Sequence, residues 1–231
     1  MTGFTDDRRK VIGILALQGA FAEHRTALEK LSCHRRLEVI LVKTIEDLSR
    51  CDALIIPGGE STTIALLARI SGLLDPLRQF VKVKPVWGTC AGAILLSQVV
   101  ENGKKGGQEL LGGMDITIAR NGWGSQLESF EAELDVQGLN DPKRPFKGIF
   151  IRAPVVLKLH QSSEDHPIQV IAQLASELLP PSFDSSDHSD EPKNFVALRQ
   201  GLHFLTTFHP ELTDDNRFHD YFVRECVLGR S

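Results

Sequence analysis

The stretch PVWGTCAGA, residues 85–93, places one cysteine between two glycines, where one apolar run ends and another begins. The run before the cysteine is short, apolar and ended by glycine, which is typical of a strand buried on both faces. The run after it, AILLSQVV (93–100), is expected to be a helix. A strand, a sharp turn and a helix with Cys90 at the corner predict a nucleophile elbow, with cysteine in the place of serine.

The same order of elements extends toward the N-terminus. Apolar residues at helical spacing run from Phe21 to Leu31 and, more loosely, from Ile64 to Leu74. They alternate with runs that predict buried strands, namely VIGILAL (11–17), LEVILV (37–42), ALIIP (53–57) and PVWGT (85–89). This alternation predicts an α/β fold in three layers, with a mostly parallel, doubly wound central sheet and helices on both faces.

The second half of the chain is richer in strand patterns. From about residue 112 to Phe208 the apolar runs predict strands that are added, antiparallel, at one side of the sheet. NRFHDYFVRECVL (216–228) predicts a closing amphipathic helix. We expect a single domain, 1–231, with an N-terminal tail (1–10) and a mobile polar loop (177–194) that is rich in Pro, Ser and Asp.

Composition excludes several classes of protein. The net charge is −4, so no basic surface predicts a nucleic-acid partner. No apolar run is long enough for a membrane span and the N-terminus lacks the apolar core of a signal peptide, so a cytoplasmic protein is expected. The four cysteines form no C-x-x-C pair, and we expect neither a metal site, a disulfide framework nor a cofactor.

Cys90 has a context that the other cysteines lack. Its position at the start of a helix favours the thiolate, because the first N–H groups of a helix are unpaired and carry partial positive charge. We therefore expect Cys90 to be a nucleophile. Cys33, Cys51 and Cys226 are expected to be packing or simply exposed residues.

A base for this thiol is found in FLTTFHPEL (204–212), a buried strand ending in His209 with Glu211 two residues later. Residues i and i+2 of an extended chain face the same way, so Glu211 is expected to hold one imidazole nitrogen while the other faces the sulfur. The remaining histidines, including His24, are expected to be structural.

Backbone donors for an oxyanion are expected on both sides of the nucleophile. PGGESTT (57–63) follows the third strand and opens a helix, with Ser61 or Thr62 as its cap. The N–H groups of Gly59 and Ala91 are the expected donors, because both loops lie at the carboxyl ends of parallel strands.

These motifs together resemble those of a known family. GTCAG, HPE and PGGES resemble a class I, triad-type glutamine amidotransferase. ALQGAFAEH, PGGESTTI, GGMDITIARNGWGSQLESFE, FIRAP and FHPEL are similar to the glutaminase subunit of pyridoxal 5′-phosphate synthase, the PdxT/SNO family, over nearly the whole chain. The resemblance implies a flavodoxin-like fold, hydrolysis of L-glutamine to glutamate and ammonia, and a separate barrel-shaped synthase subunit that takes the ammonia for vitamin B6 synthesis.

The resemblance also implies the roles of individual residues. It places the nucleophile at Cys90 and the charge-relay pair at His209 and Glu211. L-glutamine would be bound by Gly59, Glu60, Ser61, Arg120, Ile151 and Arg152. Which arginine meets the substrate carboxylate stays open. The chain departs from the family at Ser125 and in a longer segment around 160–194, away from the triad.

Two alternatives remain at this stage. One is a catalytically silent regulatory subunit with the same fold, against which the intact Cys, His and Glu argue. The other is a cysteine hydrolase or amidotransferase of another pathway, because a fold alone does not fix the substrate.

Overall fold

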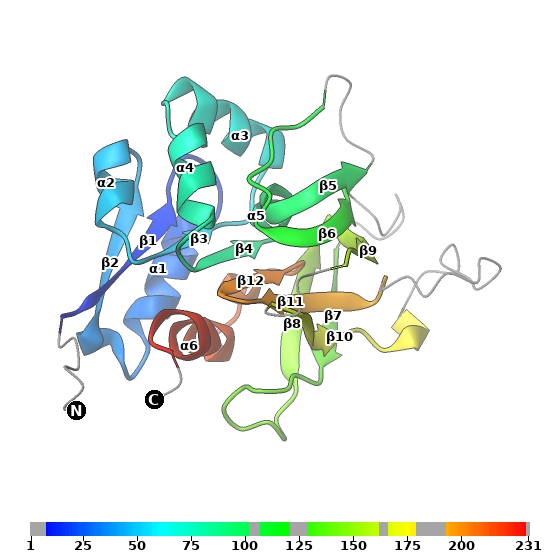
Figure 1. Ribbon diagram of the computed structural model, residues 1–231. Coiled ribbons are helices and arrows are strands. Elements are labelled where there is room, and N and C mark those ends of the chain that lie inside the picture. The colour runs from blue at the N-terminus through cyan, green and yellow to red at the C-terminus, as the bar shows by residue number, and fades with distance from the viewer. Residues whose placement is uncertain (1–7, 102–106, 121–128, 162–165, 179–192, 230–231) are drawn as a thin grey trace.

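A seven-stranded sheet forms the centre of the computed structural model, which describes residues 8–101, 107–120, 129–161, 166–178 and 193–229 (Figure 1). In sheet order the strands are β10 (Ile168–Gln173), β11 (Phe195–Gln200), β12 (His203–Thr206), β4 (Val86–Thr89), β3 (Ala53–Ile56), β1 (Lys10–Leu15) and β2 (Leu37–Val42). Strands β2, β1, β3, β4 and β12 pair in parallel, and β11 and β10 follow as antiparallel strands. This confirms the expected α/β fold with a mostly parallel sheet.

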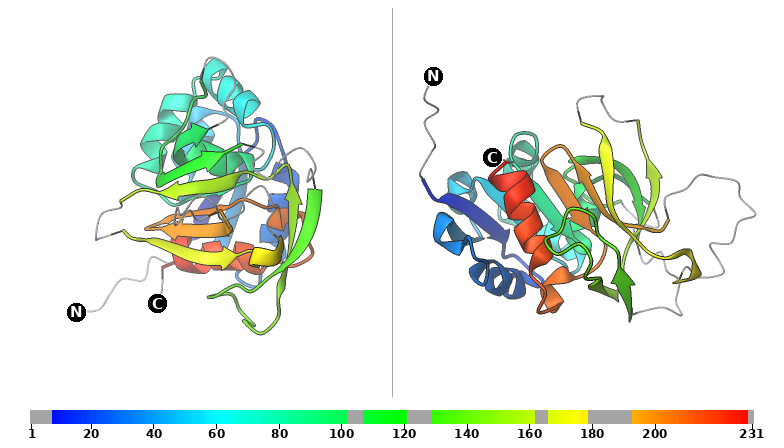
Figure 2. Two further views of the ribbon diagram at one scale, coloured as in Figure 1. Left: turned by 90° about the vertical axis from the view of Figure 1, so that its right-hand side faces the viewer. Right: turned by 90° about the horizontal axis from the view of Figure 1, so that it is seen from below.

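Helices cover both faces of this sheet. One face carries α1 (Phe21–Glu29) and α6 (Arg217–Phe222), which lie beside each other in Figure 2. The other face carries α2 (Ile45–Arg50), α3 (Ser61–Ile70), α4 (Leu74–Val81) and α5 (Ala91–Leu96). Short helical turns complete the list of helices: η1 (His34–Arg36), η2 (Ser176–Leu178), η4 (Pro210–Leu212) and the π-helix η5 (Val223–Val227). None of the described helices is long and apolar enough to cross a membrane.

Strand β3 shows why the sheet needs both helical layers. All its side chains are buried, and they alternate between two cores: Ala53 and Ile55 pack with the α1 and α6 side, whereas Leu54 and Ile56 pack with the α2–α5 side. Successive side chains of a strand point to opposite faces, so a strand that is apolar throughout must be covered twice.

Two smaller sheets flank the central one. β5 (Ser97–Glu101), β6 (Met114–Ala119) and β9 (Val155–Leu159) form one of them, and β7 (Ser129–Leu134) and β8 (Phe146–Ile151) form the other. The expected addition of antiparallel strands to the central sheet is therefore correct for β10 and β11. It is wrong for β12, which pairs in parallel with β4, and β6 to β9 pair separately.

The helix expected over residues 93–100 is wrong in its second half. α5 ends at Leu96, and Ser97 begins β5. The Ser97 hydroxyl donates to the Ile94 carbonyl at 2.8 Å and so uses an acceptor of the last helical turn. Val99 and Val100 then favour a strand because they are β-branched.

Three boundaries also differ from expectation. Leu74 belongs to α4 and not to the preceding helix, because Gly72 with φ 74° ends α3. Lys10, expected in the tail, is the first residue of β1, and residues 1–7 lie outside the described residues. Of the polar loop expected over 177–194, residues 179–192 also lie outside them, as does Ser125.

Candidate active site

Cys90 lies at the corner between β4 and α5, in a backbone conformation that few residues adopt. Its φ is 48° and its ψ is −100°, and its side chain is buried, with 6% exposed. A non-glycine residue with positive φ is strained and persists only where the surroundings fix it. The geometry matches the expected nucleophile elbow.

The glycines of the elbow are required by close backbone contacts. A Cβ on Gly92 would lie 2.0 Å from the Ile56 carbonyl oxygen, and a Cβ on Gly88 would lie 2.4 Å from the Gly92 carbonyl oxygen. Both distances are far inside van der Waals contact, so no side chain fits at either position. The two glycines let α5 pack directly against β3 and β4.

His209 and Glu211 form a buried hydrogen-bonded pair. His209 Nδ1 donates to Glu211 Oε1 at 2.7 Å, and the two residues are 8% and 6% exposed. The expected contact is present, but its expected cause is wrong. β12 ends at Thr206, and Glu211 lies in the 3₁₀ turn η4, so the turn and not an extended strand brings the carboxylate to the imidazole.

The imidazole also interacts with the thiol. Burial lowers the pKa of His209, but the contacts with Cys90 and Glu211 outweigh burial and raise this pKa to about 10. A raised pKa means that the environment favours the imidazolium. The contacts with Cys90 and Glu211 therefore favour a protonated His209.

The PGG loop packs directly on this histidine. A Cβ on Gly58 would lie 2.4 Å from His209 Cε1, so only glycine leaves room for the ring. The Gly58 carbonyl accepts from the Ala20 N–H at 3.0 Å, and a trans peptide then directs the N–H of Gly59 to the opposite side. Gln18 Oε1 accepts from the Glu60 N–H at 2.8 Å and holds the loop from the α1 side.

Glu60, Ser61 and Arg120 are brought together as expected. Arg120 donates to Glu60 Oε1 at 2.7 Å and to Ser61 Oγ at 3.0 Å. The cap of α3 is Glu60 and not Ser61 or Thr62, because Glu60 Oε2 accepts from the Thr63 N–H at 2.7 Å. Burial raises the pKa of Glu60, but hydrogen bonds from Thr62, Arg120 and Thr63 hold it well below its usual range.

Ile151 and Arg152 complete the residues implied by the resemblance. The Ile151 carbonyl oxygen lies 3.9 Å from Cys90 Sγ, so the end of β8 lies over Cys90. Arg152 has φ 41° and is exposed at the next position. The groups around Cys90 thus come from three places: the elbow itself, the PGG loop and the β7–β8 sheet.

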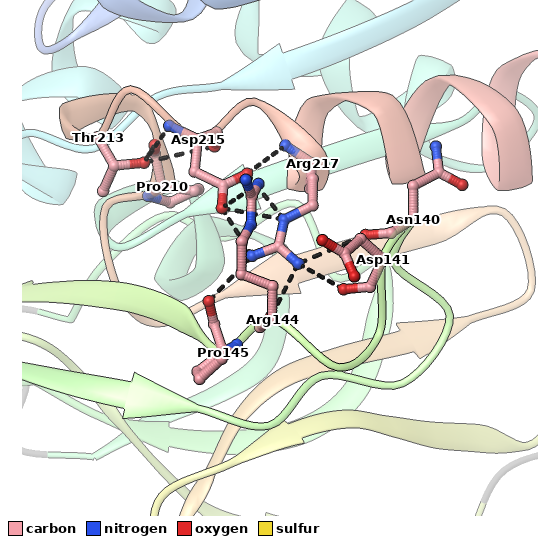
Figure 3. Close-up of polar contacts among 8 residues, drawn as sticks. All are labelled: Asn140, Asp141, Arg144, Pro145, Pro210, Thr213, Asp215 and Arg217. Atoms are coloured by element: carbon pink, nitrogen blue, oxygen red, sulfur yellow. Dashed lines mark hydrogen bonds and ion pairs between the residues drawn. The ribbon is translucent and has the colours of Figure 1, made fainter.

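The buried guanidinium of Arg217 links Asp215 to the loop that precedes β8 (Figure 3). Arg217, at the start of α6, donates through Nε and Nη2 to Asp215 and through Nη1 to the carbonyls of Asp141 and Arg144 at 3.0 and 2.8 Å. Nη2 also donates to the Pro145 carbonyl at 3.0 Å, directly before β8. Arg217 therefore fixes the start of the strand whose other end covers Cys90.

The other cysteines lie in settings that disfavour the thiolate. Burial raises the pKa of Cys33 and raises the pKa values of Cys51 and Cys226 to about 12. Cys51 and Cys226 are buried and Cys33 is half-buried. In the described part of the chain, no group of three or more His, Cys, Asp or Glu residues could hold a metal ion.

Two further residues lie beside these groups and were not predicted from the sequence to be part of the site. Gln108 Oε1 accepts from Arg120 at 2.8 Å and lies 3.3 Å from Ser61 Oγ, although its loop carried no motif. His24, expected to be structural, is fully buried beside Glu211. The only signal was its place in ALQGAFAEH, which a single sequence does not separate from ordinary helical spacing.

Comparison with known proteins places these residues in context. The SNO glutamine amidotransferase family matches residues 14–228. "Probable pyridoxal 5′-phosphate synthase subunit PDX2" of Arabidopsis thaliana is 44% identical, over 92% of this chain and 84% of its own length. "Pyridoxal 5′-phosphate synthase subunit PdxT" of Roseiflexus sp. is 46% identical, over 92% of this chain and 98% of its own length. A solved structure described as a glutamine amidotransferase superposes with a TM-score of 0.73 at 39% identity. The match covers 92% of this chain and 96% of the other.

Proposed function

The chain belongs to the SNO glutamine amidotransferase family, and from this membership we propose that Cys90, His209 and Glu211 hydrolyse L-glutamine for a pyridoxal 5′-phosphate synthase. The observation that carries the proposal is the His209–Glu211 pair at 2.7 Å next to a cysteine with φ 48°. Nucleophile, base and orienting carboxylate are the groups that amide hydrolysis through a thioester needs.

The reaction begins with attack of the Cys90 thiolate on the side-chain amide carbon of glutamine. The carbonyl oxygen becomes an oxyanion, for which the N–H groups of Gly59 and Ala91 are the proposed donors. The C–N bond then breaks, and the departing nitrogen takes the proton held by His209 and leaves as ammonia. A water molecule gives a proton to His209, attacks the thioester carbon and releases glutamate and the Cys90 sulfur.

The proposed binding site for glutamine uses the groups beside the triad. Glu60 Oε2 accepts hydrogen bonds from Thr62 and Thr63, and Oε1 accepts one from Arg120. Glu60 carries the negative charge that would attract the substrate ammonium. Arg120 and Arg152 are the candidate cations for the substrate carboxylate, and the exposed position of Arg152 beside Ile151 suits the outer end of the ligand.

The proposed partner is a separate synthase subunit that consumes the ammonia. The named relatives are synthase subunits, which supports a heteromeric enzyme. Ammonia reacts as a nucleophile only when unprotonated, so a path sealed from water between the two subunits is part of the proposal. The proposed compartment is the cytoplasm, where the four free cysteines stay reduced.

The experiment that tests the proposal is Cys90→Ala in the complex with the synthase subunit. Glutamine-dependent coenzyme synthesis and glutamate release should disappear, whereas synthesis from added ammonium salt should continue. Glutamine turnover that survives the change would show that Cys90 is not the nucleophile. Covalent labelling of wild-type Cys90 by a glutamine-like diazo ketone separates an active subunit from a silent one, and strong hydrolysis of γ-glutamyl peptides would favour another cysteine hydrolase.

A further inference from the structure

The carboxylate of Glu211 has an outer oxygen that faces away from His209. Oε1 accepts from His209, whereas Oε2 is buried and has no hydrogen-bond partner in the described part of the chain. Among the described residues, His24 faces Oε2 with its Nε2 3.7 Å away, and both side chains are 0% exposed. A buried carboxylate oxygen without a nearby donor is costly, so the state of His24 matters to the triad.

His24 is held in place from several elements. It projects from α1, and its Nε2 also lies 3.1 Å from Thr89 Oγ1 at the end of β4. Its Nδ1 lies 2.9 Å from Nε2 of His219, which comes from α6. Both rings pack edge-on against Trp87, with centroids 5.4 and 4.8 Å from it. The titratable groups that face His24 are therefore His219, Glu211 and, beyond the carboxylate, His209.

Both buried histidines are neutral at physiological pH. Burial, together with the proximity of His219 and His209, holds the pKa of His24 well below its usual range. Burial alone lowers the pKa of His219 to about 3. The contact between His24 and Glu211 is thus not an ion pair. Each neutral ring carries one N–H, and its position decides whether an N–H or a nitrogen lone pair of His24 faces the carboxylate.

The histidine pair allows two proton arrangements. If His219 Nε2 donates to His24 Nδ1, the His24 proton sits on Nε2 and faces Thr89 and Glu211. In the reverse arrangement a lone pair faces the carboxylate, and His219 Nδ1 carries a buried N–H without a partner. Orphaned N–H groups in the interior are rarer than orphaned acceptors, and a lone pair beside a carboxylate is repelled. Both effects favour the first arrangement.

We propose that His24 is a positioning residue of the triad, whose Nε2–H faces the outer oxygen of Glu211 and keeps Oε1 turned toward His209. His219 fixes the proton of His24 on the side of the carboxylate. His24 acts through Glu211 and does not touch the reacting atoms. The inference rests on the proposed roles of Cys90, His209 and Glu211.

Three substitutions of His24 separate the N–H from the volume of the ring. The amide nitrogen of glutamine reaches about as far as Nε2, that of asparagine about as far as Nδ1, and leucine has neither. In the complex with the synthase subunit, His24→Leu and His24→Asn should lower kcat for glutamine about threefold to tenfold. This is less than the loss of a full hydrogen bond to a charged group, because Nε2 lies 3.7 Å from Oε2. The KM should stay within about twofold, and His24→Gln should recover most of kcat.

A second readout reports the thiol directly. The rate of Cys90 alkylation by iodoacetamide, followed by mass spectrometry of the full chain against pH, gives the ionisation midpoint of the sulfur. A Glu211 that is held less firmly against His209 makes the imidazolium less favourable, so the midpoint should move to higher pH in the Leu and Asn variants and stay in place in the Gln variant. A loss of overall stability does not move this midpoint.

His203→Gln is the matched control, because His203 is a partly buried histidine on β12 that contacts none of these groups and should leave kcat and the midpoint unchanged. The inference is overturned if His24→Leu keeps the kcat and the Cys90 midpoint of the wild type. It is also overturned if His24→Gln loses as much kcat as His24→Leu. If the His24 variants do not fold, His219→Phe decides, and a midpoint equal to wild type overturns the inference. Two other outcomes would overturn the proposed function instead of the inference. One is glutamine hydrolysis by Cys90→Ala, and the other is an ionisation midpoint of wild-type Cys90 near that of a free thiol.

Discussion

The backbone N–H of Cys90 donates to the carbonyl of Thr206 at 2.8 Å. This bond continues the parallel pairing of β4 with β12, in which Thr89 lies opposite Thr206. The nucleophile is therefore tied to the strand that leads into His209. The two catalytic candidates are far apart in the sequence, but they are neighbours because their strands are neighbours in the sheet.

The charge of Glu211 should be essential to the pair. In Glu211→Gln the amide can donate to His209 Nδ1, which removes the proton from that nitrogen and leaves the ring in the wrong tautomer. We expect kcat to fall about 10²- to 10⁴-fold, as when the carboxylate of a triad becomes an amide. The check is steady-state glutamate release, and circular dichroism and a thermal melt should match wild type. A kcat within a few-fold of wild type would contradict a charge-relay role.

Gly58 should be required for the position of His209. Gly58→Ala places a Cβ 2.4 Å from His209 Cε1, so the ring must move away from its present place. Glutaminase activity should fall at least about tenfold, which corresponds to about 1.4 kcal/mol in the activation free energy. The free energy of unfolding should change by less than this amount. Gly72→Ala is the comparison: its Cβ meets nothing within 4 Å but its φ is 74°, so it should cost about 1 kcal/mol of stability and leave kcat unchanged. Equal kinetic effects in the two variants would refute the steric explanation.

Arg120 should act on substrate binding more than on the chemical step. Lysine cannot reproduce the fork that reaches Glu60 and Ser61 together, so Arg120→Lys should raise the KM for glutamine about tenfold with a smaller change in kcat. Arg50→Lys, in an exposed pair with Glu38, is the control and should change neither constant. A pure loss of kcat in the Arg120 variant would move this residue from binding to catalysis.

Buried neutral histidines should make the fold sensitive to acid. The pKa of His219 is about 3 in the folded protein and near its usual 6.5 when unfolded, so below pH 6.5 the unfolded chain binds a proton that the folded protein does not. Stability from this group is complete above pH 6.5 and falls by about 1.4 kcal/mol per pH unit as pH drops toward 3. Denaturant titrations at pH 7, 6 and 5 should show a shallower decline in His219→Phe, and an unchanged slope would mean that His219 is not the group responsible.

Arg217 should contribute to stability through the loop that it binds. Arg217→Met keeps much of the side-chain volume but leaves the carbonyls of Asp141, Arg144 and Pro145 without their donor. We expect the free energy of unfolding to fall by about 3 kcal/mol or more, because the remaining members of a buried charged network are left without their partner. Arg144→Met, whose side chain is mostly exposed, should cost under about 1 kcal/mol. Unfolding by guanidinium measures both.

Much of the fold could be predicted because local pattern and burial agree. The runs that became β1, β2, β3 and β4 are apolar on both faces, and a strand with two apolar faces fits only between two helical layers. Residues 97–100 were one exception. They are apolar enough to continue α5, and their strand pairing with β6 depends on a neighbour that no local pattern shows.

The sequence by itself determined which side chains we propose as the reacting groups. A cysteine between glycines at a strand end, and a histidine followed two residues later by a glutamate, leave few other uses for these side chains. Tertiary structure alone decided how they are held: that Glu211 reaches His209 through a 3₁₀ turn, that Gly58 gives the ring its space, and that His24 stands behind the carboxylate. The physical reason is that sequence motifs record neighbours along the chain, whereas the protonation and orientation of a buried group are set by neighbours in space.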